Sequence, residues 1–74
     1  MPYIEIKCYP KDEAIKRKVV EKINETFLEL WGCPQEAISI SLEEVQPENW
    51  NNVVENDILP NKDKMMIFSG KKEY

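Results

Sequence analysis

The chain begins with methionine followed by proline, and this pair can generate an unusual base. We expect the small residue Pro2 to let an aminopeptidase remove Met1, which leaves Pro2 with a free secondary amine in its ring. A terminal amine with a pKa of about 7.7 to 8.0 is about a tenth to a sixth neutral at pH 7, and a ring amine starts higher. With Met1 attached, the same nitrogen is an amide without a basic lone pair. Pro2 is therefore the candidate general acid/base, provided that Met1 is removed.

The two cysteines offer no second catalytic centre. Cys8 and Cys33 are too far apart for a CxxC redox pair, and the chain has no histidine, so the usual zinc-ligand spacings cannot be built. We expect both thiols to be reduced and buried among apolar side chains. The sequence predicts neither a metal site nor a redox site.

Composition restricts the classes of partner. The chain has 14 acidic and 10 basic residues and a net charge of −4, whereas nucleic-acid binding depends on basic residues that neutralise phosphates. No apolar run approaches the roughly 20 residues of a membrane span, and the N-terminus lacks the charged and apolar regions of a signal peptide. We expect a cytoplasmic protein that binds neither nucleic acid nor membrane.

Two stretches in which apolar and polar residues alternate predict strands. The first covers residues 3–9 and is stopped by Pro10. The second covers residues 37–45, and its apolar side consists of Ile38, Ile40 and Leu42. Each strand has one apolar face, as expected for a sheet with one side buried.

A helical pattern over residues 12–31 separates the two strands. Asp12 is a good N-cap residue, and apolar residues follow at three- and four-residue steps: Ile15, Val19, Ile23, Phe27 and Leu30. Gly32 lies where a left-handed residue ends a helix, and Pro34 prevents its continuation. The sequence predicts an amphipathic helix that packs on the apolar face of the strands.

Residues 47–74 are less periodic and are expected to form a C-terminal arm. A short helix that ends at Pro60 is indicated by apolar residues at helical spacing: Trp50, Val53, Val54 and Ile58. The segment MMIF, residues 65–68, indicates a short third strand before a polar tail. We expect this arm to reach a neighbouring copy of the chain.

Together these elements predict an α/β (α+β) fold in one domain, residues 1–74. Strand, helix and strand make a βαβ unit whose strands run parallel with a right-handed crossover. A chain of this length buries only about 60% of its unfolded surface, and a two-stranded sheet leaves two edges and one face open. We therefore expect two copies to pair into a four-stranded sheet with the helices on one face, as a homodimer or a larger homo-oligomer.

The order of these segments resembles a known family. The N-terminal MP leads directly into IEIKCYP, the helix reads DEAIKRKVVEKI, and ISISLEEVQPENW follows. Over about residues 2–60, these segments resemble the 4-oxalocrotonate tautomerase family, and particularly its tautomerase PptA branch. The resemblance implies a βαβ subunit that forms dimers or hexamers and an isomerase that tautomerises 2-oxo acids through a terminal proline. It also implies that no metal or organic cofactor is used.

Carried over onto this sequence, the resemblance assigns three site residues and one absence. The catalytic proline falls on Pro2, a cationic substrate-binding residue at the start of the helix falls near Lys11, and an aromatic pocket residue falls on Trp50. A second family arginine, on the second strand, falls on Ser39, so that charge is missing. We therefore expect a phenylpyruvate-like monocarboxylate rather than a dicarboxylate, held less precisely by a lysine than by the planar fork of an arginine.

Two other functions are compatible with the same residues. A non-catalytic oligomeric interaction protein would keep the scaffold after losing catalysis with the strand arginine. A hydratase, dehalogenase or decarboxylase would use a cationic terminal proline to protonate its substrate, and its activity would fall as the amine deprotonates.

Overall fold

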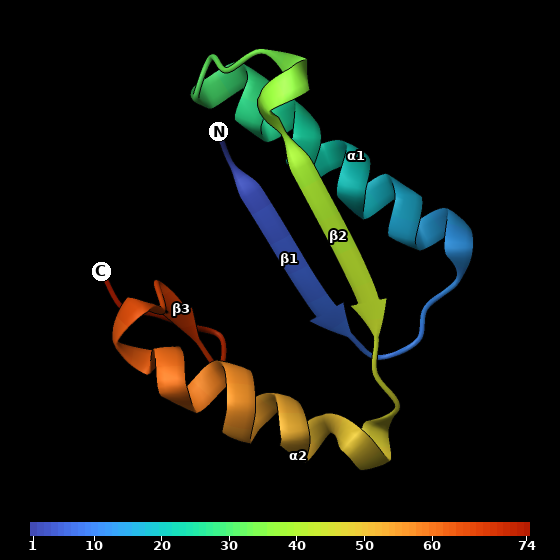
Figure 1. Cartoon of the computed structure of the whole chain (residues 1–74), viewed down its shortest axis with the longest axis vertical. Coiled ribbons are helices and arrows are strands. Elements are labelled where there is room, and N and C mark those ends of the chain that lie inside the picture. The colour runs from blue at the N-terminus through green and yellow to red at the C-terminus, as the bar shows by residue number, and fades with distance from the viewer.

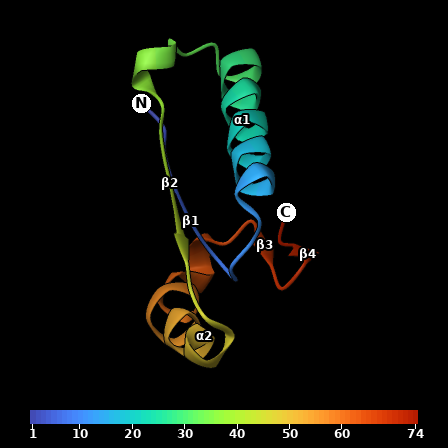
Figure 2. The ribbon, with the colours of Figure 1, turned by 90° about the vertical axis from the view of Figure 1, so that its right-hand side faces the viewer.

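The main sheet has two parallel strands, joined by a long helix that covers one of its faces. The computed structural model describes all 74 residues of the chain. Strands β1 (Tyr3–Cys8) and β2 (Ser39–Glu44) lie side by side, and helix α1 (Glu13–Leu30) connects them (Figure 1). Seen edge-on, α1 lies along one side of the sheet (Figure 2). The β-α-β arrangement expected from the sequence is thus confirmed.

Strand pairing begins at Pro2 and ends just beyond Cys8. The N–H of Ser39 donates to the carbonyl of Pro2 at 3.2 Å, and the N–H of Val45 donates to the carbonyl of Cys8 at 2.8 Å. Both strands are shorter than the expected ranges 3–9 and 37–45. The second begins later because Gln35–Ala37 forms a 3₁₀ turn that leads into it.

Helix α1 ends where the glycine and proline signals place its end. Asp12 precedes the helix with extended backbone angles, although its side chain makes no capping hydrogen bond. At the other end, the N–H of Trp31 donates to the carbonyl of Phe27, and Gly32 follows with a φ of 65°. A left-handed residue at this position turns the chain away from the helix axis.

The C-terminal arm contains more helix than the sequence indicated. Residues 47–64 are helical with changing hydrogen-bond patterns: 3₁₀ over Pro47–Asn49, α2 (Trp50–Val53), a π turn over Val54–Ile58 and 3₁₀ over Leu59–Lys64. The helical backbone angles are interrupted at Asn61 (φ −110°, ψ 17°), directly after Pro60, and a further short turn then continues to Lys64. The stop expected at Pro60 is thus a kink, after which helical structure resumes.

The last residues form a small hairpin rather than a strand and a tail. β3 (Ile67–Phe68) pairs antiparallel with β4 (Lys71–Lys72). Ser69 and Gly70 connect them with φ values of 49° and 82°, and positive φ at both central residues is typical of a tight hairpin turn. The polar residues expected as a tail thus supply the second strand.

The single chain is open rather than closed around a core. Only three residues are buried: Pro2, Ala37 and Val53. The radius of gyration is 13.8 Å, whereas a compact chain of this length would have about 11 Å. Neither strand of the main sheet has a second neighbour, so both edges are free. No helix combines the length and the apolar character required to cross a membrane.

Candidate active site

Pro2 is buried at the amino end of β1, beneath an exposed Met1. The hydrogen bond from the Ser39 N–H to the Pro2 carbonyl holds the backbone on the carboxyl side of Pro2 against β2. Met1 is 97% exposed, so its removal takes away almost no packing. The nitrogen that removal would free belongs to a residue that is already shielded from solvent.

Ser39 on β2 is in register with Tyr3, the residue after Pro2, and its backbone N–H donates to the Pro2 carbonyl. It is exposed, and its side chain takes part in no hydrogen bond within the chain. The position that carries an arginine in the resembled family therefore lies opposite Tyr3, one residue from the candidate base, with a short neutral side chain on it.

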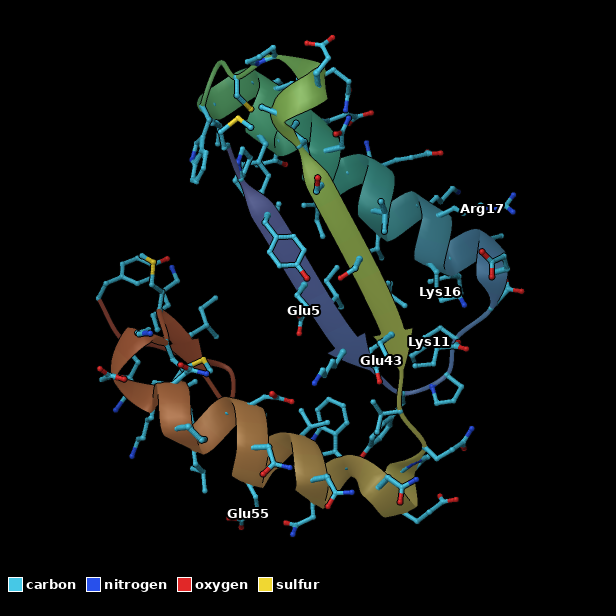
Figure 3. The ribbon with its side chains drawn as sticks, in the orientation of Figure 1. Glu5, Lys11, Lys16, Arg17, Glu43 and Glu55 are labelled. Carbon is cyan, nitrogen blue, oxygen red and sulfur yellow. The ribbon has the colours of Figure 1, made fainter.

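Lys11 lies at the opposite end of β1, in the connection to α1 (Figure 3). The six residues of β1, followed by Tyr9 and Pro10, separate it from Pro2, and the strand alone spans about 20 Å at roughly 3.3 Å per residue. The Lys11 backbone N–H donates to Oε2 of Glu44 at 2.9 Å, whereas the Lys11 ammonium has no ion-pair partner. It is an exposed, unneutralised cation, out of reach of Pro2 of the same chain.

Trp50 also lies beyond the carboxyl end of β1. Its ring meets the ring of Tyr9 edge to face, with centroids 5.2 Å apart. It lines a cavity of about 280 Å³ between the arm and the open face of β1, together with Glu5, Lys7, Val53, Asp57, Ile58 and Met65. This volume is just below the range of about 300 to 1,000 Å³ for ligand pockets, which suits a small organic acid.

An ion pair that the sequence gave no reason to expect closes one side of this cavity. Nζ of Lys7 lies 2.6 Å from Oδ2 of Asp57 and joins β1 to the π turn. The hydrogen bond that Lys7 donates to Asp57 raises the pKa of Lys7, so this lysine remains charged. Lys7, Val53 and Asp57 also line a larger polar cavity of about 550 Å³, so the ion pair stands between two cavities. The partners are 50 residues apart in the sequence. The alternating pattern placed Lys7 on the polar face of its strand but did not indicate Asp57 as its partner.

A second charged cluster surrounds Glu44 at the end of β2. Nζ of Lys16 lies 3.2 Å from Oε2 of Glu44 and 3.2 Å from Oε1 of Glu13. The pKa of Glu44 is lowered, first by the N–H of Lys11 and then by Lys16. The pKa of Lys16 is raised, first by Glu13 and then by Glu44. Three charges and one backbone amide thus fasten the start of α1 to the end of β2.

The cysteines and the acidic residues do not form a further centre. Cys8 and Cys33 are free thiols, half-buried rather than buried as expected, because the open chain covers few side chains fully. No three histidine, cysteine, aspartate or glutamate side chains converge as a group that could hold a metal ion.

The expected site residues thus divide between the two ends of the sheet. Pro2 and Ser39 lie at the amino ends of the strands, and Lys11 and Trp50 lie at the carboxyl ends. A single chain does not bring the candidate base to the candidate carboxylate-binding residue.

Comparison with known proteins identifies the family of this chain. The family model described as "Tautomerase enzyme" matches residues 2–55. Tautomerase PptA of Escherichia coli O127:H6 (strain E2348/69 / EPEC) is 32% identical over 68 residues, which cover 89% of this chain and 91% of that protein. Tautomerase PptA of Escherichia coli (strain K12 / DH10B) is 31% identical over 68 residues, 89% of this chain and 88% of that protein. The resemblance found in the sequence is confirmed, and the chain belongs to the tautomerase family.

Proposed function

We propose that this protein is a cytoplasmic tautomerase that interconverts the enol and keto forms of phenylpyruvate-like 2-oxo acids, with Pro2 as the general acid/base. Membership of the tautomerase family supports an isomerase-type activity. The observation that carries the proposal is the buried position of Pro2 beneath an exposed Met1. No cofactor is required for this reaction, because one group can both accept and return the proton.

The proposed proton transfer is balanced within the substrate and Pro2. The neutral Pro2 nitrogen takes the proton of the enol hydroxyl, and the resulting ammonium gives it to the neighbouring carbon, which forms the ketone. Burial disfavours the ammonium form and so lowers the pKa of the amine. A pKa one unit below the reference terminal amine costs the charged form about 1.4 kcal/mol and brings the neutral fraction near one half at pH 7.

The proposed site is completed by a second copy of the chain. Two copies related by a twofold axis pair their β1 edges antiparallel, because the axis reverses the strand direction. Pro2 of one copy then lies near Lys11 and Trp50 of the partner subunit. The unneutralised Lys11 ammonium would bind the substrate carboxylate, and the cavity beside Trp50 would hold its apolar part. Three buried residues and two free sheet edges in the single chain support this assembly.

The base is tested by blocking its nitrogen. Intact-mass measurement on protein from its native source should show the mass of the chain without Met1. A chain with a non-cleavable N-terminal extension keeps the Pro2 nitrogen as an amide, and its rate of phenylpyruvate ketonisation should fall to the uncatalysed rate. The Pro2→Ala variant is the control, because it retains a primary amine and should keep partial activity. A native mass that includes Met1, or an unchanged rate in the extended chain, would contradict the proposal.

The shared site is tested at low substrate concentration by mixing two chains, one without a free base and one with weak carboxylate binding. One chain carries the N-terminal extension with an intact Lys11, and the other carries Lys11→Ala with a free Pro2. If Pro2 and Lys11 of a site come from different copies, one of the two sites in a hybrid dimer has both residues intact. Random mixing makes about half of the dimers hybrid, so about a quarter of the wild-type activity should be restored. If each site is built within one copy, mixing restores nothing.

A non-catalytic interaction protein on the same scaffold is the second candidate. The observation that favours it is the absence of a cationic side chain at position 39, whose backbone N–H bonds to the Pro2 carbonyl. It predicts a normal oligomer in light scattering and no rate with any enol of a 2-oxo acid. A panel of hydration, dehalogenation and decarboxylation substrates with pH profiles separates the remaining enzymatic alternatives, since a cationic proline loses activity as pH rises.

A further inference from the structure

Glu44 fastens the segment that carries Lys11. This segment, residues 9–12, connects β1 to α1 and includes Pro10, which has no N–H to donate. The Lys11 N–H is the only one in the segment that makes a hydrogen bond within the chain, and its acceptor is Oε2 of Glu44 at 2.9 Å. The backbone position of Lys11 therefore depends on one side chain of β2.

The charge of Glu44 is balanced by a residue other than Lys11. Nζ of Lys16 lies 3.2 Å from the same Oε2 atom, and Lys16 is only 19% exposed at its side chain. A carboxylate without such a partner would attract the nearby Lys11 ammonium and compete with a substrate carboxylate for it. Glu44 instead binds the Lys11 backbone, and the Lys11 ammonium remains free of ion pairs.

We propose that Glu44 is a positioning residue: its carboxylate holds the Lys11 backbone so that the Lys11 ammonium is presented, unneutralised, to the substrate carboxylate. This inference rests on the proposed function, because it assigns Glu44 an effect on substrate binding through Lys11. It adds a residue that touches neither the substrate nor Pro2. The strand geometry makes the role specific to one of two adjacent glutamates.

Glu43 provides the matched control. It precedes Glu44 on β2 and points to the opposite face of the sheet, in register with Lys7. Its side chain makes no hydrogen bond or ion pair within the chain. The same substitution at Glu43 therefore changes the net charge equally without touching the Lys11 segment.

The kinetic test compares Glu44→Ala, Glu44→Gln and Glu43→Ala in the full-length, processed protein with phenylpyruvate enol as substrate. We expect Glu44→Ala to raise KM about three- to tenfold, the range of one hydrogen bond, with kcat within about twofold of wild type. Glu44→Gln keeps an acceptor oxygen and should restore most of the affinity, and Glu43→Ala should leave KM unchanged. Adding Glu44→Ala to Lys11→Ala should raise KM no further, since both substitutions remove the same interaction.

Hydrogen exchange of the Lys11 amide supplies a readout that does not depend on activity. The amide should be protected in wild type and in Glu44→Gln and should exchange faster in Glu44→Ala. If the amide loses protection in an active enzyme whose KM is unchanged, the positioning role is overturned while the proposed function stands. If the wild-type protein has no activity with any 2-oxo acid enol, the proposed function fails and the positioning role fails with it.

Discussion

The hydrogen bond between the Ser39 N–H and the Pro2 carbonyl ties position 39 to the backbone of the proposed base. Ser39 is in register with Tyr3, so a side chain at position 39 starts one residue from Pro2. A serine there adds no charge, so in the proposed site only Lys11 can neutralise a carboxylate. At the residue scale, this is the basis for expecting a substrate with one carboxylate.

The substrate class can be altered at this position. We expect Ser39→Arg to raise the preference for a dicarboxylate over a monocarboxylate about tenfold in kcat/KM, about 1.4 kcal/mol, because a bidentate partner for a second carboxylate is added. Ser41→Arg is the matched control: it lies two residues along the same face, in register with Glu5 rather than with Tyr3, and therefore farther from Pro2. An equal change in preference in both variants would mean that net charge alone is responsible.

The residues of the candidate site could be selected from the sequence, but their separation could not. Pro2, Lys11 and Trp50 each follow from residue type and position in a family pattern. The distance between Pro2 and Lys11 follows from the length and direction of β1, and only a structure or an assembly relates the two ends. The ion pair of Lys7 and Asp57 could not be predicted from the sequence for a similar reason, since its partners are 50 residues apart.

At the element scale, the βαβ unit was predictable because its signals are local. Alternation defines β1 and β2, and helical spacing defines α1, so the element types were right and the ends differed by one or two residues. The C-terminal arm was less predictable, because its α, π and 3₁₀ turns alternate within residues 47–64 and Pro60 can be accommodated at the start of a new turn. Local sequence signals do not specify which hydrogen-bond pattern each turn adopts.

The Glu44 carboxylate, which connects β2 to Lys16 of α1 and to the Lys11 backbone, should make folding stability depend on pH. The pKa of Glu44 is lowered from its ordinary value of 4.5, so its contribution is fully present above pH 4.5 and is lost as pH falls through the folded-state pKa below that value. We expect the free energy of unfolding, measured in urea from pH 7 to pH 3, to fall less steeply below pH 4.5 in Glu44→Gln than in wild type. Glu43→Gln, which changes the same charge on the other face, should keep the wild-type slope. Parallel curves for all three proteins would contradict this assignment.

At the scale of the whole molecule, the open single chain lacks what a stable fold requires. Three buried residues and a radius of gyration of 13.8 Å leave apolar side chains exposed on several elements, among them Ile15, Val19, Leu30 and Trp31 of the α1 region. A sheet of two strands with both edges free is also a template for pairing with another chain. The proposed pairing of β1 edges would cover one edge and would bring Pro2 to the Lys11 of the partner subunit.

The free edge of β1 can be blocked without breaking its bond to β2. Pro2 and Cys8 both use their carbonyls toward β2, and backbone groups alternate in direction along a strand, so the N–H of Glu5 points to the free edge. Glu5→Pro removes that outward N–H and places a ring where a paired strand would lie. We expect this variant to be monomeric in size-exclusion chromatography with light scattering, and to lose tautomerase activity as the shared sites separate.

The control for this prediction is Glu5→Ala, which removes the same side chain and its hydrogen bond from Tyr3 but retains the outward N–H. It should keep the oligomeric state and most of the activity of the wild type. Circular dichroism of both variants checks that the helices are retained, so that loss of pairing is separated from unfolding. If folded Glu5→Pro forms the same oligomer as wild type, the copies do not meet through β1, and the site must be completed through another surface.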